Sequence, residues 1–410
     1  MTTDRIDFLE AELEEKEFKL NTLLEITSAI NSNMPVEYLM KIFLYALQDQ
    51  LGFNRVVLFN KLDSWTVQVK NGAKGNYDDF NVDHELGRFK EITFIQSSSN
   101  ELINDFQVVI PVFHKDKPLA FLLLNHASQT IQDKDKFRAN LGFIQTLTNI
   151  IVVAIENKQL ANQRVVQERM KKELELASEM QKFLFPAELP SNRKMDIAAR
   201  YHSHNQVGGD YYDFIPIRKN EYLMCIGDVS GKGISAAMLM ANFQATLRTL
   251  LIVQKYDLDF LVRELNEKVM QTTKGEKFIT FFIAHFNAET RVMTYINAGH
   301  NHPILTNGKE VMMLDQGTIG LGMFEELPFL NIGEVTLKPN TTLISYTDGV
   351  VELENEQGEQ FGIERLVKVI HSFYMLKMED VCNLTFGKLD EYRGNSPFVD
   401  DTAIMACRFF

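Results

Sequence analysis

The stretch from Phe143 to Phe185 contains neither proline nor glycine. These two residues are the usual interruptions of a helix, so the stretch can form one helix roughly 60 Å long. Pro186 and Pro190 then end it. A chain of 410 residues with such a helix near its middle is expected to fold as two domains. Apolar residues recur along the second half of the helix at coiled-coil spacing: Val166, Met170, Leu174, Ala177, Met180 and Leu184.

The middle of this helix, from Asn157 to Arg169, is much more polar than its ends. Two roles fit the pattern equally well. The helix is a passive linker, or it pairs in a parallel homodimer and carries a signal between the domains. We therefore expect four parts: an N-terminal amphipathic helix at residues 1–30, a sensor domain at 31–156, a linker helix and possible coiled coil at 157–186, and a C-terminal domain at 187–410.

The N-terminal half mixes helix and strand patterns. An amphipathic helix over Phe8–Ile30 either packs on its own domain or pairs with a second copy. Further along, the chain predicts a helix, three strands and a closing helix: Val36–Leu51, Arg55–Asn60, Gln107–Phe113, Leu119–Leu124 and a helix from about Asp133. This order, with the closing segment Ile151–Leu160, resembles a GAF domain. The resemblance implies a small α/β sensor for an unknown small ligand or partner.

No ligand signature stands out in that half. Its histidines, His84, His114 and His126, have no metal-ligand spacing and are expected to be structural or exposed. Trp65 either lines a pocket or is a partly buried loop aromatic.

Charge and cysteine usage exclude several classes of protein. Asp and Glu number 55 against 42 Lys and Arg, a formal net charge of -13, and no basic run is present, which argues against nucleic-acid binding. Cys225, Cys382 and Cys407 are scattered, as expected for reduced, buried thiols in a cytoplasmic protein. The N-terminus does not resemble a signal peptide, and the apolar run Ile150–Ile155 is too short to span a bilayer, so no membrane insertion is expected.

The C-terminal half is rich in strand patterns grouped in hairpins, with the helices apart from them, which predicts an α+β sandwich. The expected strands are Tyr222–Ile226, Phe278–Phe286, Val292–Ile296, Thr342–Tyr346 and Ala403–Phe409, and the expected helices are Ile234–Val253, Leu258–Gln271 and Ile363–His371.

Acidic residues lie beside glycines, or beside one another, at the ends of these strands. They are Asp210 after Gly208-Gly209, Asp228 after Gly227, Asp348 before Gly349, and Asp400-Asp401. One such acid usually only marks a turn. Four positions, far apart in sequence, indicate instead a hard-cation site built from carboxylates, to which the Val229 carbonyl can add an oxygen ligand.

Gly227 to Gly233 superficially resembles a phosphate-binding P-loop. That motif requires four residues between its glycines and Ser or Thr after the lysine. Here three residues separate Gly227 from Gly231, and Gly233 follows Lys232. A P-loop nucleotide hydrolase is therefore not expected.

The ordered motifs Gly208-Gly209-Asp210-Tyr-Tyr-Asp213, Gly227-Asp228-Val-Ser-Gly231-Lys-Gly233, Asn297-Ala-Gly-His300, Tyr346-Thr-Asp348-Gly349 and Asp400-Asp401 resemble those of the SpoIIE/RsbU-type branch of the metal-dependent serine/threonine protein phosphatases. The resemblance covers about Glu175 to Phe410. It implies an α-β-β-α sandwich with two Mn²⁺ or Mg²⁺ ions. Its implied ligands, which are also its catalytic residues, are Asp228 as the bridge, Asp210 with the Val229 carbonyl at one ion, and Asp348 with Asp400 at the other.

The same resemblance implies a protein-serine/threonine phosphatase acting on a small STAS-type anti-sigma-factor antagonist. Two cations acidify a water molecule and neutralise the phosphate, so no nucleophilic Cys or Ser is required. The alternative is a non-catalytic pseudophosphatase that binds a phosphoprotein. Asp401 is expected to support Asp400, Asp213 to bond the ligand groups or cap its turn, and His300 to be structural or to serve the site.

Overall fold

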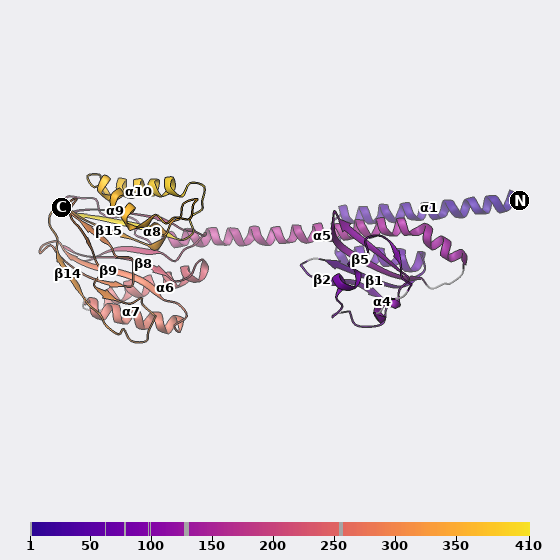
Figure 1. The fold of residues 1–410 in the computed structure, drawn as a ribbon, viewed down its shortest axis with the longest axis horizontal. Helices are drawn as coiled ribbons and strands as arrows, with labels where there is room; N and C mark the ends of the chain where they lie inside the picture. The colour runs from indigo at the N-terminus through magenta and orange to yellow at the C-terminus, as the bar shows by residue number, and fades with distance from the viewer. Residues whose placement is uncertain are drawn as a thin grey trace. The chain divides into compact units, whose positions relative to one another are not determined.

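The computed structural model describes residues 2–61, 63–77, 79–96, 98, 100–126, 131–253 and 257–410. The chain divides into two compact units, Met1–Glu168 and Arg169–Phe410 (Figure 1). Helix α5, Ile131–Lys182, begins in the first unit and ends in the second. The boundary between the units therefore lies inside the segment that the sequence predicts to be a linker helix.

The N-terminal unit is built on one antiparallel sheet with strand order β2-β1-β5-β4-β3. Its strands are β1 (Phe53–Lys61), β2 (Trp65–Asn71), β3 (Thr93–Phe94), β4 (Val108–His114) and β5 (Lys117–His126). Its helices, besides the first part of α5, are α1 (Thr2–Asn31), α2 (Val36–Tyr45), the π-helical turn η1 (Ala46–Gln50), α3 (Val82–Leu86) and α4 (Glu101–Asn104).

Both faces of this sheet are buried, and alternate residues of β1 face opposite sides. Val56 and Leu58 pack with α1, α2 and α5, whereas Val57 and Phe59 pack with α3, α4 and the loops around them. Trp65 belongs to the second cluster and lies against Phe121, with ring centroids 5.4 Å apart, so it is a partly buried aromatic within the packing.

One apolar stretch within α5 is longer than the sequence suggested. Phe137–Lys182 is long and apolar enough, by length and composition, to cross a bilayer. In its first part, however, Leu141, Ile144, Leu147 and Ile151 are buried in the core of the N-terminal unit. Packing therefore accounts for the apolar residues of that part of the helix.

The C-terminal unit contains two sheets. One has the order β13-β10-β9-β8-β7, with β14 also pairing β10, and the other has the order β12-β11-β15-β16-β6. The strands are β6 (Met195–His202), β7 (Tyr211–Arg218), β8 (Glu221–Val229), β9 (Ile279–Asn287), β10 (Val292–Ala298), β11 (Ile304–Thr306), β12 (Val311–Met313), β13 (Gly317–Thr318), β14 (Gly333–Thr336), β15 (Thr341–Tyr346) and β16 (Thr402–Phe409). The helices are α6 (Ile234–Val253), α7 (Leu258–Thr273), α8 (Asp348–Val351), α9 (Gly362–Ser372) and α10 (Met378–Arg393).

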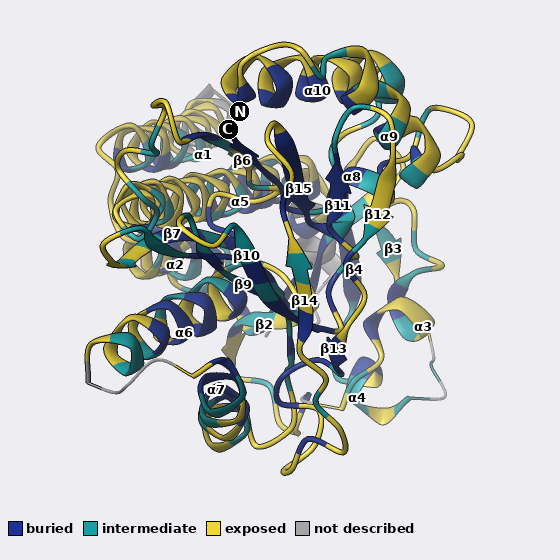
Figure 2. Ribbon diagram, turned by 90° about the vertical axis from the view of Figure 1, so that its left-hand side faces the viewer, coloured by how far each residue is buried: buried dark blue, intermediate teal, exposed yellow. Residues whose placement is uncertain are grey.

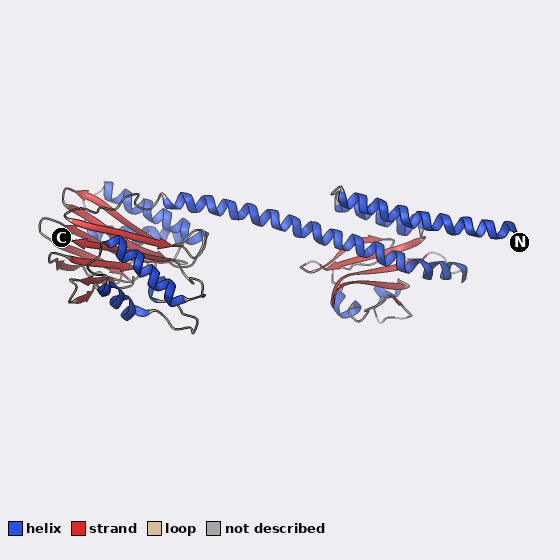
Figure 3. Cartoon of the chain, turned by 90° about the horizontal axis from the view of Figure 1, so that it is seen from above, coloured by secondary structure: helices blue, strands red, loops and turns tan. Residues whose placement is uncertain are grey.

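The two sheets pack face to face, with α6 and α7 on one side and α9 and α10 on the other (Figure 1). Seen from above, helices lie over the strands of this unit (Figure 3). The alternation along β8 shows how the sequence produces these layers. Leu223 and Cys225 pack against the α6 and α7 side, while Met224 and Ile226 fill the space between the sheets. In Figure 2, α10 is buried on the side facing the strands and exposed on the other.

All the expected elements of this unit are present, but the unit contains more strands and helices than the sequence pattern predicted. Helix α6 has the expected bounds, and the ends of the expected strands differ from the prediction by at most three residues. The elements that were not expected are β6, β7, β11, β12, β13, β14, α8 and α10. For α10 a signal was present, since Met378, Val381, Cys382, Phe386 and Leu389 recur at helical spacing and are buried. The three cysteines are buried and unpaired, as predicted.

Candidate metal and phosphate site

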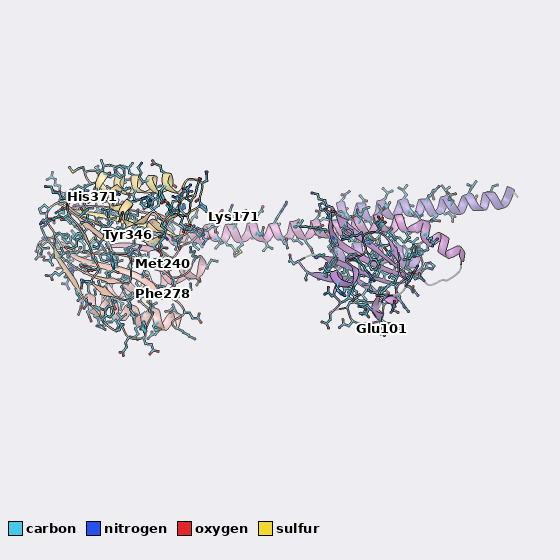
Figure 4. The ribbon with its side chains drawn as sticks, viewed as in Figure 1. Glu101, Lys171, Met240, Phe278, Tyr346 and His371 are labelled. Carbon is cyan, nitrogen blue, oxygen red and sulfur yellow. The ribbon has the colours of Figure 1, made fainter. Side chains whose placement is uncertain are left out.

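Strand register brings the acidic motifs together in pairs. In the first sheet, Tyr211 of β7 pairs with Gly227 of the antiparallel strand β8. Asp210 and Asp228 are the next residues in this register, so they lie opposite one another. In the second sheet, Tyr346 pairs with Ile404, which places the residues after β15 opposite those before β16. Asp348 and Asp400-Asp401 are those residues. Tyr346 is labelled in Figure 4, within the strands of the C-terminal unit.

Hydrogen bonds from Thr347 connect the two sheets at this edge. Thr347 Oγ1 donates to Asp210 Oδ2 at 2.8 Å and accepts from the Ala403 amide at 2.8 Å. Thr347 is itself fully buried. The second sheet therefore fixes the orientation of Asp210, which belongs to the first. Sequence reasoning did not identify Thr347, although it lies beside Asp348 in one of the acidic motifs.

Asp401 has a different role from Asp400. Its carboxylate accepts hydrogen bonds from the Gly209 amide at 2.6 Å and the His204 amide at 2.8 Å, and only 5% of the residue is exposed. Asp400 is more exposed, and its Oδ2 lies 2.7 Å from Lys232 Nζ. The Asp401 carboxylate is thus used to hold the loop before Asp210. The Asp400 carboxylate can instead exchange Lys232 for another cation.

Burial and mutual repulsion raise the pKa values of this carboxylate cluster. Burial, followed by repulsion from Asp348 and Asp400, raises the pKa of Asp228 to about 7. Burial and repulsion from Asp400 likewise raise the pKa of Asp348 to about 6. Burial and then the Asp228 charge raise the pKa of Asp210 well above its ordinary value. The negative charge of these carboxylates is therefore only partly balanced by positive charge.

The donor chemistry fits a hard divalent cation. All side-chain donors are carboxylate oxygens, and buried Asp210 Oδ1 has no hydrogen-bond partner among the described residues. Within the same described ranges, no three His, Cys, Asp or Glu side chains converge closely enough to hold an ion as they lie. Mg²⁺ does not require such a closed set, because it keeps several waters and takes one or two carboxylates.

At two glycines of this site, neighbouring atoms lie so close to the backbone that little room is left for a side chain. A Cβ on Gly208 would lie 1.8 Å from the Tyr201 hydroxyl oxygen and 2.5 Å from Asp401 Oδ2. A Cβ on Gly209 would lie 3.1 Å from the Val229 carbonyl oxygen. The glycines therefore let the loop before Asp210 approach both Asp401 and the end of β8.

Asp213 serves neither of the roles expected from the sequence. Arg248 on α6 donates to it twice, from Nε at 2.8 Å and from a terminal nitrogen at 2.9 Å, and the Tyr211 hydroxyl donates at 2.5 Å. The Asp213 side chain is fully buried. Alternation along β7 turns Tyr211 and Asp213 toward α6, so this carboxylate joins a helix to the sheet and does not support the ligand groups.

His300 lies beside the site but is held by protein contacts. Its Nδ1 is 2.9 Å from Thr280 Oγ1, and its amide donates to Asn297 Oδ1 at 2.7 Å. Burial lowers the pKa of His300 to about 4, so the imidazole is neutral at physiological pH. These contacts favour the structural role among the two that the sequence left open.

Gln181, in the last turn of α5, contacts the loop that carries Asp210, which sequence reasoning had missed. Its Nε2 donates to the Gly208 carbonyl at 2.7 Å, and its Oε1 accepts from the Gly208 amide at 3.2 Å. The residue is buried. No sequence signal marks it, because a single glutamine near a helix end is unremarkable until its partner is known.

The fold of the C-terminal unit is shared with a solved phosphatase domain. The SiaA-PP2C domain of Pseudomonas aeruginosa superposes with a TM-score of 0.54 at 21% sequence identity, over 60% of this chain and 99% of that domain. The unit thus has the fold of a PP2C-type protein phosphatase.

Sequence comparison finds similar proteins for the same part of the chain. Residues 218–410 match the family model of stage II sporulation protein E, SpoIIE. The chain is 29% identical over 209 residues to the phosphoserine phosphatase RsbU of Bacillus subtilis strain 168, covering 50% of this chain and 62% of RsbU. It is 28% identical over 187 residues to the phosphoserine phosphatase RsbP of the same organism, covering 44% of this chain and 46% of RsbP. The C-terminal half of the chain is therefore similar to the SpoIIE family and to two phosphoserine phosphatases.

These matches leave parts of the chain unaccounted for. The chain spans less than two thirds of the length of the curated relatives it matches. The family model begins at residue 218, after Asp210 and the loop that Gln181 holds. The assignment of Asp210 to the site therefore depends on the geometry described above.

Proposed function

We propose that the chain is a metal-dependent protein-serine/threonine phosphatase. The observation that carries this proposal is the convergence of acidic strand ends from both sheets of a SpoIIE-type domain, with Asp228 under repulsion from Asp348 and Asp400. Buried carboxylates that repel one another would be stabilised by divalent cations.

Each residue of the site would have its own role in binding the metal ions. Asp228 would bridge two Mn²⁺ or Mg²⁺ ions, Asp210 with the Val229 carbonyl would complete the site of one, and Asp348 with Asp400 would hold the other. Such ions, when bound, supply an activated water and neutralise the phosphate. Thr347 orients the Asp210 carboxylate, and Asp401 keeps the Gly208-Gly209 loop in place.

Phosphate release from a phosphoserine protein tests this function. The full chain with Mn²⁺ should release phosphate, and Asp228→Asn should reduce the rate by at least about 100-fold, since it removes the charge shared by both ions. Asp259→Asn, which removes a surface carboxylate paired with Arg263, is the control and should retain activity. Undiminished release by Asp228→Asn would reject the assignment.

The substrate in this proposal is a small phosphorylated regulatory protein of the STAS type, an anti-sigma-factor antagonist in a cytoplasmic partner-switching pathway. The support is the relationship to RsbU and RsbP, which are named phosphoserine phosphatases. Comparing kcat/KM for a phosphorylated STAS protein with that for an unrelated phosphoserine peptide tests it. Equal values for the two substrates would argue against a dedicated STAS substrate.

Regulation by a GAF-like N-terminal domain through α5 completes the proposal. Gln181 supports it, because the same helix that begins in the N-terminal unit ends in hydrogen bonds to Gly208. Val166, Met170 and Met180 are exposed apolar residues of the coiled-coil pattern, as a parallel homodimer requires. Cysteines introduced at Val166 and Met170 should crosslink two chains. If they do not, the dimer is wrong, and if deletion of residues before Val166 leaves activity unchanged, so is the regulation.

A pseudophosphatase that only binds a phosphoprotein is the second candidate. The observation in its favour is that, among the described residues, no three potential ligands converge on one point. Calorimetric titration with Mn²⁺ separates the candidates. Binding that is lost in Asp228→Asn supports the enzyme, and absence of binding supports the scaffold.

A further inference from the structure

Lys232 lies against one of the proposed metal ligands. Its Nζ is 2.7 Å from Asp400 Oδ2 and donates to the Val399 carbonyl at 2.6 Å. The lysine belongs to the loop between β8 and α6, whereas Asp400 precedes β16 in the other sheet. The two residues meet only because the sandwich brings these strand ends together.

The loop that carries Lys232 has a shape that favours glycine. Gly231 and Gly233, on either side of the lysine, have φ angles of 89° and 73°. A Cβ on Gly231 would lie 2.8 Å from Lys277 Nζ, which donates to the Ser230 carbonyl at 3.0 Å. The two flanking glycines thus place one ammonium group at the carboxylate cluster and leave room for a second beside it.

Structural stabilisation is a weak reason for this ion pair. The Lys232 side chain is 45% exposed and that of Asp400 35% exposed. Pairs exposed to this extent contribute about 0–1 kcal/mol to stability. Lys232 nevertheless lies 2.7 Å from an oxygen of one proposed metal ligand, Asp400, so its charge is placed at the site itself.

A phosphoprotein substrate would bring additional negative charge to this site. Two divalent ions balance the four proposed carboxylate ligands, and a phosphorylated serine adds a further charge of about -1.5 to -2. Arg248, on the helix that follows the Lys232 loop, is already bound to Asp213. Lysine binds phosphate as a compact point charge on a flexible stem, and half-exposed Lys232 has the freedom to do so.

We propose that Lys232 binds the substrate's phosphate group, a role that rests on the proposed phosphatase function. The Asp400 contact holds the ammonium at the site. With a cation bound to that carboxylate, the ammonium would be free to bind the phosphate group. Lys232 would thus be the substrate-binding cation that the sequence motifs by themselves did not reveal.

Steady-state kinetics of the full chain with Mn²⁺ are the first test. Lys232→Gln should raise KM for a phosphoserine protein by about tenfold or more, with a smaller change in kcat, because a charge-assisted hydrogen bond to the ground-state phosphate is lost. Lys232→Arg should recover part of that loss. Lys388→Gln is the matched control, since Lys388 is 46% exposed and paired with Glu391 on α10, and its KM should stay at the wild-type value. An unchanged KM in Lys232→Gln would overturn the proposal.

Calorimetry with inorganic phosphate in the presence of Mg²⁺ tests the same role without turnover. Lys232→Gln should weaken phosphate binding by about tenfold while Mg²⁺ alone binds at least as tightly as to the wild type, because the ammonium no longer competes for Asp400. Weaker Mg²⁺ binding with unchanged phosphate affinity would assign Lys232 to holding Asp400 and reject the proposal. If the wild type releases no phosphate from any phosphoprotein, the phosphatase function fails, and this measurement still decides whether Lys232 binds phosphate.

Discussion

Gln181 and Gly208 exchange hydrogen bonds in both directions, through the glutamine amide at 2.7 Å and its carbonyl at 3.2 Å. This contact joins the last turn of α5 to the residue two positions before Asp210. This pair of residues thereby connects the long helix to the loop that leads into the carboxylate cluster. Two consequences can be measured, one for stability and one for regulation.

Gln181→Leu should destabilise the C-terminal unit by about 1–3 kcal/mol, because both buried polar groups of Gly208 lose their partner. Urea unfolding measures this change. In the same variant, deleting residues before Val166 should alter phosphatase activity less than it does in the wild type, since the connection is already broken. An equal effect of the deletion in both backgrounds would show that the signal does not pass through Gln181.

Asp213→Asn should lower the free energy of unfolding by roughly 3 kcal/mol. The buried carboxylate accepts from Arg248, from the Tyr211 hydroxyl and from the Phe214 amide, and the amide side chain cannot accept all of these bonds. Chemical denaturation gives the value. Arg263→Ala, which breaks an exposed pair with Asp259, should cost under about 1 kcal/mol. Similar losses in both variants would contradict the structural role assigned to Asp213.

Gly208→Ala should destabilise the protein by about 2 kcal/mol or more, because the new methyl group would overlap the Tyr201 hydroxyl and Asp401. Tyr201→Phe in the same chain should restore part of the loss by removing the closer of the two atoms. Gly387→Ala is the control. Nothing lies within 4 Å of a Cβ there, and its position in α10 predicts a gain of about 0.5–1 kcal/mol. Thermal unfolding distinguishes the three variants.

Asp228→Asn should stabilise the metal-free protein at neutral pH by about 1–4 kcal/mol. The pKa of Asp228 is raised in the folded state to about 7 from its ordinary value of 3.8. The folded protein therefore holds the proton more tightly than the unfolded chain, and stability from this group is complete below about pH 4 and lost as the pH rises to about 7. The difference in stability between Asp228→Asn and the wild type should therefore develop over the same pH range. Unfolding in a chelator, measured across that range, checks the prediction.

That prediction has a counterpart with metal present. Saturating Mn²⁺ should stabilise the wild type and leave Asp228→Asn almost unchanged, because a ligand that binds only the folded state raises its stability. A wild type that is equally stable with and without Mn²⁺ would contradict a metal site at Asp228.

Elements whose pattern is local can be predicted from the amino-acid sequence. The bounds of α6 follow from its own residues, and the long helix follows from the absence of proline and glycine after Phe143. The acid and glycine motifs are local as well, and they are sufficient to name the acidic residues of the candidate site. Their spacing in the chain, however, could not establish which acids lie beside one another.

The contacts that give these residues distinct roles could be seen only in the folded protein. Asp213 faces α6 and binds Arg248, Thr347 reaches Asp210 from the other sheet, and Lys232 meets Asp400 across more than 160 positions of sequence. Each contact depends on strand register and on the packing of one sheet against the other. Those are properties of the folded chain, because residues far apart in sequence come into contact only when the strands have paired and the sheets have packed together.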